Sequence, residues 1–210
     1  MSFTKTAALA AVALALAHTG SAQAAIVADG TFAEGASSGA FTTYSDGDSF
    51  GPWIVIGDSV DVIGSYWQRA PGGSYSVDLD GNNVGGIAQS VTLAPGKYQL
   101  SFFLSGNPDG GNATKTVAVS VDGIKQDYSF TTGSNSRANM GYQLETLNFD
   151  VASATSTVLK FRSVDQGPSA YGPVIGNVNI TAVPEPASVA LMLAGLGGLG
   201  FAARRRQHKL

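Results

Sequence analysis

Short segments in which apolar and polar residues alternate follow one another along most of the chain. In residues 98–104 every second side chain is large and apolar, and residues 117–121 repeat the pattern with valine. Neighbouring side chains of a β-strand point to opposite faces, so a period of two predicts strands with one face in a core. The residues that this pattern places on the core side are Val60, Val62, Val77, Leu79, Tyr98, Leu100, Phe102, Leu104, Val117, Val119, Val121, Tyr128, Phe130, Leu147, Phe149, Val151, Leu159, Phe161, Val174, Val178 and Ile180.

Turn-forming residues separate these segments. They include Ala94-Pro95-Gly96, the stretch 107–111, Asp122-Gly123 and Gly172-Pro173. No sustained helical period occurs before residue 189. Roughly ten short strands within residues 25–182 predict an all-β fold, in which two antiparallel sheets pack face to face as a jelly-roll β-sandwich. We see no internal repeat and expect one domain.

The stretch from Trp53 to Val91 holds both tryptophans of the chain. Trp53 opens an apolar run and is expected in the core. Tyr66 and Trp67 stand just before the breaker 70–73, at an edge or in a loop, where we expect Trp67 to be the exposed ring. The acids of this stretch fall near turns or on the face opposite the core, and are Asp58, Asp61, Asp78 and Asp80.

The first 24 residues have the organisation of a secretory signal peptide. Lys5 supplies a positive start, residues 7–17 are apolar, and Ala22-Gln23-Ala24 forms a cleavage site of small residues. The mature chain is therefore expected to begin near Ala25.

The last 28 residues, 183–210, have three parts in order: Pro184-Glu185-Pro186, an apolar stretch 189–203 and the basic cluster Arg204-Arg205-Arg206. They resemble the PEP-CTERM sorting signal of Gram-negative bacteria. The resemblance implies transient inner-membrane insertion, removal of the tail by an exosortase, and release to the cell surface or an exopolysaccharide matrix. Fifteen helical residues span about 22 Å, less than the hydrocarbon core of about 30 Å. An ordinary membrane anchor is the alternative.

Composition excludes several chemistries for the part between these ends. The chain has no cysteine, and its two histidines, His18 and His208, lie in the end segments. Catalysis by Ser-His-Asp or Cys-His groups and histidine-ligated metal sites are therefore excluded. Residues 25–183 carry seven Lys and Arg against fourteen Asp and Glu, a net charge of −7. Nucleic acid is not an expected partner of such a domain.

Six motifs in sequence order resemble the choice-of-anchor C domain, an exported bacterial module. They are DGTFAEG (29–35), WIVIGDSVDVIGSYW (53–67), SYSVDLDGN (74–82), GGIAQSV (85–91), FFLSGNPDGG (102–111) and GPVIGNVNI (172–180). That domain is similar to plant cell-wall proteins of a domain-of-unknown-function family and, more remotely, to galactose-binding-like jelly-roll modules. The resemblance implies a surface or matrix protein that binds sugar, with no established enzymatic activity.

Relatives of this kind carry an acidic residue in each of two elements near a structural calcium. Here Glu34 matches the first, but Gly176 stands where an Asp is expected in the closing segment. Alternation puts position 176 on the same face as Val178 and Ile180, so an inward carboxylate is missing. Glu34 and Asn177 are left as weak calcium ligands. The run 78–83 lacks the glycine and glutamate positions of an EF-hand and is interpreted as a hairpin corner.

The sequence favours a non-catalytic protein that is associated with exopolysaccharide or binds another carbohydrate. Aromatic rings that stack on sugars, bordered by polar side chains, are the expected site. The candidates are Tyr66, Trp67, Tyr75, Asp78, Asn107 and Tyr171. Two alternatives stay open: a polysaccharide hydrolase that uses paired aspartates, either Asp58 with Asp61 or Asp78 with Asp80, and a purely structural surface protein.

Overall fold

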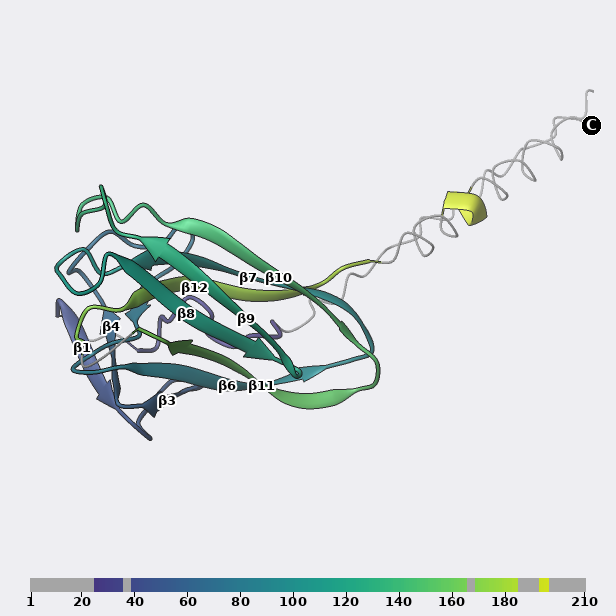
Figure 1. Cartoon of the computed structure of the whole chain (residues 1–210). Helices are drawn as coiled ribbons and strands as arrows, with labels where there is room; N and C mark the ends of the chain where they lie inside the picture. Colours follow the sequence, from purple (N-terminus) through teal and green to yellow (C-terminus); the bar gives the residue numbers. More distant parts are fainter. Residues whose placement is uncertain (1–24, 36–38, 166–168, 185–192, 197–210) are drawn as a thin grey trace, which may run out of the picture.

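Two antiparallel sheets of six strands each pack face to face in the computed structural model (Figure 1). The structure describes residues 25–35, 39–165, 169–184 and 193–196. The strands of the described residues are β1 (Phe41–Ser45), β2 (Ser49–Phe50), β3 (Trp53–Gly57), β4 (Ser59–Ile63), β5 (Ser76–Asp78), β6 (Gly85–Leu93), β7 (Gly96–Gly106), β8 (Thr114–Val121), β9 (Ile124–Thr131), β10 (Gln143–Val151), β11 (Thr155–Ser163) and β12 (Pro173–Ala182). The expected all-β sandwich is confirmed.

The chain crosses from one sheet to the other several times. Sheet A has the order β1-β4-β5-β12-β7-β10, and sheet B has the order β2-β3-β6-β11-β8-β9. All pairings between neighbouring strands are antiparallel. β12, the last strand, lies between β5 and β7 in sheet A, so strands far apart in the sequence meet in one sheet.

Of the side chains that alternation placed on the core side, all but Val174 lie in the core between the sheets. Trp53, Phe102 and Phe161 lie at its centre and are fully buried. The ring of Phe161 contacts the rings of both Trp53 and Phe102 edge-on. Trp53 also donates its indole N–H to the carbonyl of Asp29 at 3.0 Å. The expectation that Trp53 belongs to the core is confirmed.

The turn between β8 and β9 shows how local chemistry sets register. Asp122 and Gly123 have φ of 47° and 79°, and Val121 pairs directly with Ile124. A two-residue hairpin with both residues at positive φ matches the right-handed twist of its strands, and Asp-Gly is a preferred pair for it. The turn predicted at these two residues is confirmed.

β12 contains a bulge that reverses the expected orientation of its first half. Its register against β7 shifts between Gly176 and Asn179, and Asn177 has φ of 49°. An extra residue in a strand inverts which side chains face inward beyond it. Ile175 therefore joins the main core, whereas Val174 packs on the outer face of sheet A. The expectation that positions 174 and 176 share a face with Val178 and Ile180 is wrong.

The outer face of sheet A carries a second, smaller apolar cluster. It consists of Ile63, Trp67, Met140 and Val174, with Tyr66 and Tyr142 packed against it. Trp67 is only 6% exposed and donates its indole N–H to the hydroxyl of Ser76 at 2.9 Å. The expectation that Trp67 is exposed is therefore wrong. The segments 64–75 and 132–142 fold over this face and cover it.

The predicted signal peptide, residues 1–24, and most of the predicted sorting tail lie outside the described residues. Residues 193–196 are helical, and no helix within the described ranges is long and apolar enough to cross a membrane.

Candidate binding pocket

A cavity of about 250 Å³ opens on the outer face of sheet A, beside the Trp67 cluster. Strands β1, β4 and β5 form its floor, and the loops that follow β4, β5, β7 and β11 form its walls. The aromatic residues lining it are Phe41, Tyr66, Trp67 and Tyr171. The polar residues lining it are Thr43, Asp61, Asp78, Asn82, Asn107 and Asp109.

The floor follows from strand alternation. Val60 and Val62 point into the main core, which turns Asp61 between them to the outer face. Thr43 pairs with Asp61, and Asp61 pairs with Asp78, so these three side chains form a row across β1, β4 and β5. The Thr43 hydroxyl donates to Asp61 Oδ1 at 2.6 Å. Burial raises the pKa of Asp61, and this hydrogen bond lowers it in part.

Asp78 is held rigidly beneath the loops. Its Oδ1 accepts hydrogen bonds from the backbone N–H of Asp80 at 3.1 Å and of Gly172 at 3.0 Å. Its Oδ2 accepts one from the Asn107 side-chain amide at 2.7 Å. Burial raises the pKa of Asp78 well above its ordinary value, against the lowering effect of the hydrogen bonds from Asp80 and Asn107. Asp78 is on the face opposite the core, as expected, but loops cover it.

Aromatic rings form one wall and the rim. Phe41 and Tyr171 are 45% and 40% exposed, and the rings of Phe41 and Tyr66 meet edge-on with centroids 5.5 Å apart. Tyr66 is half-buried and stacks at a tilt on Trp67 behind it, at 5.6 Å. Tyr66 and Trp67 therefore have different roles: Tyr66 reaches the surface, and the buried Trp67 ring supports it from below.

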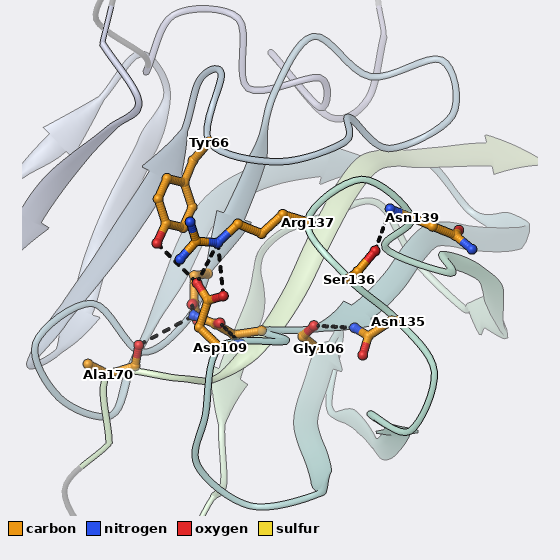
Figure 2. Close-up of polar contacts among 10 residues, drawn as sticks. Tyr66, Gly106, Asp109, Asn135, Ser136, Arg137, Asn139 and Ala170 are labelled. Carbon is orange, nitrogen blue, oxygen red and sulfur yellow. Dashed lines mark hydrogen bonds and ion pairs between the residues drawn. The ribbon is translucent and has the colours of Figure 1, made fainter.

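A polar triad holds Tyr66 in place (Figure 2). Its hydroxyl donates to Asp109 Oδ2 at 3.1 Å, and the Arg137 guanidinium donates to both carboxylate oxygens of Asp109, at 2.9 and 3.1 Å. The guanidinium also lies over the Tyr66 ring, 4.1 Å from its centroid. Asp109 precedes β8 and Arg137 follows β9, so three loops meet at this point.

A buried lysine joins two of the walls. Lys115 donates its ammonium to the carbonyl of Gly110 at 2.8 Å and to that of Tyr171. Burial lowers its pKa, while the charges of Asp165, Asp78 and Asp80 raise it. Lys115 therefore connects the loop bearing Asn107 and Asp109 to the loop bearing Tyr171, with three carboxyl groups behind it.

The structure brings five of the six predicted ligand-binding residues into one pocket: Tyr66, Trp67, Asp78, Asn107 and Tyr171. Tyr75 is elsewhere, packed against the main core with the Arg69 guanidinium over its ring at 5.3 Å. Sequence reasoning missed Phe41, Thr43, Asp109, Arg137 and Lys115. The aromatic and β-branched residues of 41–45 favour a strand and could have indicated the first two, whereas the others lie in loops or beneath them.

The residues proposed to hold calcium do not gather into a metal site. Asn177 donates its side-chain amide to the carbonyl of Pro71 at 2.9 Å, and a Cβ at Gly176 would meet Ala70. Glu34 is exposed. Within the described ranges, no three acidic or histidine side chains lie together in a way that could hold an ion. These residues therefore do not fit a calcium ion, and we assign none to them.

The aspartate pairs considered for hydrolysis are not presented together to the pocket. Asp58 does not line the cavity, and Asp80, although next to Asp78 on the chain, is fully buried away from it.

Two sequence families match the chain. The family described as Protein of unknown function (DUF642) matches residues 25–181, and the PEP-CTERM protein-sorting motif matches residues 182–206. The sorting motif indicates export. The resemblances inferred from the sequence motifs are confirmed at this level.

Individual proteins are similar to part of this chain. Halomucin of Haloquadratum walsbyi (strain DSM 16790 / HBSQ001) is 32% identical over 152 residues, or 71% of this chain, and the chain spans about 2% of halomucin's length. The solved structure of TmCBM61 in complex with β-1,4-galactotriose has a TM-score of 0.51 and 17% identity, covering 76% of this chain and 99% of that one. CBM35 from Paenibacillus barcinonensis has a TM-score of 0.44 and 17% identity, covering 68% and 99%. The likeness to TmCBM61 supports the jelly-roll fold.

Proposed function

The chain belongs to the DUF642 family of proteins of unknown function, and on that premise we propose that it is a non-catalytic, carbohydrate-binding protein of the cell surface or extracellular matrix. The observation that carries this proposal is the pocket on the outer face of sheet A. It combines two exposed aromatic rings with carboxylate, amide and hydroxyl groups that loops hold in fixed positions.

This arrangement suits a sugar because a sugar ring has both apolar and polar surfaces. Its C–H faces pack on flat aromatic rings, and its hydroxyl groups exchange hydrogen bonds with carboxylates and amides. Phe41, Tyr66 and Tyr171 offer the rings, and Asp61 and Asn82 offer polar groups at the opening. The complex of TmCBM61 with a galactotriose supports the idea that a jelly roll of this kind can hold a glycan.

The signal segments at the two ends of the chain support transport of the protein to the matrix. The PEP-CTERM motif at residues 182–206 supports recognition by an exosortase, and residues 1–24 serve as the signal peptide. In this proposal the sandwich, residues 25–182, is the part that works outside the cell. The exopolysaccharide of the producing cell is the proposed ligand.

The test compares alanine variants of two tyrosines. Tyr66→Ala removes a ring from the pocket and should abolish retention on the polysaccharide in a pull-down, with a smaller loss of melting temperature than Trp67→Ala, because Tyr66 is only half-buried. Tyr75→Ala is the matched control, because this half-buried tyrosine lies outside the pocket. It should leave binding unchanged.

The variant Trp67→Ala tests whether Trp67 supports the fold of the pocket or contacts the sugar itself. Because Trp67 is buried, its removal should cost about 3–5 kcal/mol of stability through the cavity that it leaves. If Tyr66→Ala and Tyr171→Ala both bind as the unaltered protein does, the pocket is not the sugar site. If the unaltered protein binds no polysaccharide at all, the purely structural role replaces this proposal.

A further inference from the structure

We propose that the sugar held by this pocket is an amino sugar with a free, protonated amine, so that the ligand is a de-N-acetylated, cationic glycan. The inference rests on the proposed function and narrows its ligand to one chemical class. It comes from the charges that line the cavity.

Within the described residues, the charged side chains that line the pocket are all carboxylates, and none is basic. Asp61, Asp78 and Asp109 face it, whereas no Lys, Arg or His is among its lining residues in the described part of the chain. The two nearest bases are already engaged. Arg137 pairs with Asp109, and the Lys115 ammonium is held by two backbone carbonyls beneath the wall.

The three acids differ in how many hydrogen-bond donors and charge partners their carboxylates already have. Asp109 has its charge balanced by Arg137 and its oxygens bonded to Arg137 and Tyr66. Asp78 receives three N–H donors. Asp61 receives one hydroxyl, from Thr43 to Oδ1, and the described residues offer no hydrogen bond to its Oδ2. Asp61 is therefore the carboxylate at which a ligand donor fits.

Asp61 and Asp78 also oppose each other directly across β4 and β5. Asp78 is buried and already receives three N–H donors, so Asp61, which is only partly buried, is the acid of this pair that a ligand can reach. An ammonium group placed at Asp61 Oδ2 would make a charge-assisted hydrogen bond there. The rings of Phe41 and Tyr66 beside it favour a cation further.

The same lining discriminates against acidic glycans. A uronic acid would place its carboxylate among three others with no free base to receive it, and such like-charge contacts weaken binding strongly. A neutral or N-acetylated sugar would still stack and form hydrogen bonds but would bring no cation to Asp61 Oδ2.

The experiment measures the affinity of the purified protein for four oligosaccharides of equal length by calorimetry. They are fully de-N-acetylated glucosamine oligomers, the matching N-acetylglucosamine oligomers, neutral β-1,4-galactose oligomers and galacturonic acid oligomers. The measurements are made at a mildly acidic pH, where the free amine is protonated. The de-N-acetylated ligand should bind about tenfold more tightly or better than its N-acetylated match, and the galacturonic acid ligand should bind least.

Asp61→Asn should reduce this preference to about threefold or less, because it keeps the shape and removes the charge. Asp127→Asn is the control: Asp127 is an exposed acid on β9, outside the pocket, so this variant loses the same charge elsewhere. It should keep the full preference, which separates a built site from general attraction of an acidic protein for a polycation.

Three outcomes overturn the inference while leaving carbohydrate binding intact: equal affinity for the N-acetylated oligomers, tighter binding of the galacturonic acid oligomers, or an unchanged preference in Asp61→Asn. Displacement of the cationic ligand by millimolar calcium, with direct calcium binding that Asp61→Asn removes, would instead assign the site to a metal ion and overturn it too. If no oligosaccharide binds and the polysaccharide pull-down also fails, it is the proposed function that falls.

Discussion

Asp80 is a carboxyl group that the fold buries without a well-formed hydrogen bond. None of its surface is exposed, and neither carboxylate oxygen has a partner among the described residues, although the Ser163 hydroxyl and the Gly85 amide lie close enough to lower its pKa. Burial, helped by the negative charge of Asp165, outweighs these effects and the positive charge of Lys115, and raises the pKa of Asp80 to about 6. A buried carboxylate of this kind costs stability when it ionises.

The sign of the pH dependence follows. The folded protein holds the Asp80 proton up to about pH 6, whereas the unfolded chain releases it near the ordinary pKa of 3.8. Between these values the folded state binds more protons, so the free energy of unfolding falls as the pH rises, by at most about 3 kcal/mol for this group. Urea unfolding should therefore show greater stability at pH 4.5 than at pH 7.5 from this residue.

Asp80→Asn should remove that part of the pH dependence and raise stability at pH 7.5. Asp127→Asn, at an exposed position, should leave the pH profile parallel to that of the unaltered protein. An Asp80→Asn protein that is less stable at pH 7.5 would show that the ionised carboxylate, paired with Lys115, is stabilising.

At the scale of the element, the bulge in β12 decides what the strand presents to each side. Asn177 takes the left-handed conformation, with φ of 49°, and its side-chain amide binds the carbonyl of Pro71. Val178 beside it donates its N–H to the carbonyl of Gly30 at 2.8 Å. The bulge thus joins β12 to the segment 64–75 on one side and to the N-terminal segment on the other.

Two substitutions at position 177 separate backbone from side chain. Both Asn177→Ala and Asn177→Gly lose the bond to Pro71, but only alanine meets the steric cost of positive φ. Asn177→Ala should therefore be about 1 kcal/mol less stable than Asn177→Gly in thermal unfolding.

Asn179 offers the matched control two residues along the same strand. It is exposed, pairs regularly with Ser101 and is not at positive φ. There the order should reverse, since glycine weakens a strand interior. The same order at both positions would contradict the left-handed conformation of Asn177.

At the scale of the whole molecule, the pocket and the sorting tail lie at opposite ends of β12. The strand begins at Pro173, next to the loop that carries Tyr171, and ends at Ala182, where the PEP-CTERM match begins (Figure 1). Ten residues of strand span about 33 Å. A sandwich held at its tail would therefore present the pocket away from the point of attachment.

We predict that the extracellular product ends at or near residues 184–186. Mass spectrometry of extracellular material should recover peptides up to residue 183 and none from Leu191 onward. Replacing Pro184, Glu185 and Pro186 with alanine should keep the tail on the protein and the protein in the membrane fraction. Recovery of the intact C-terminus outside the cell would contradict exosortase processing.

The sequence alone determined the fold class, the core faces of most strands, the hairpin at residues 122–123 and the sorting motif. These depend on local patterns: a period of two, turn residues at positive φ, and a linear motif. It also named five of the residues that line the pocket, because aromatic and polar side chains next to turns mark the ends of strands.

Only the tertiary structure decided what happens on the outer face of sheet A. Alternation tells which face a side chain points to, but not whether a loop from elsewhere covers it. Asp78 is buried by Asn107 and Gly172, 29 and 94 residues away in the sequence, and Trp67 is buried by Met140 and its neighbours. The bulge at Asn177 reversed the start of β12 for a related reason: it depends on contacts with Pro71 and Gly30 that no local pattern reveals.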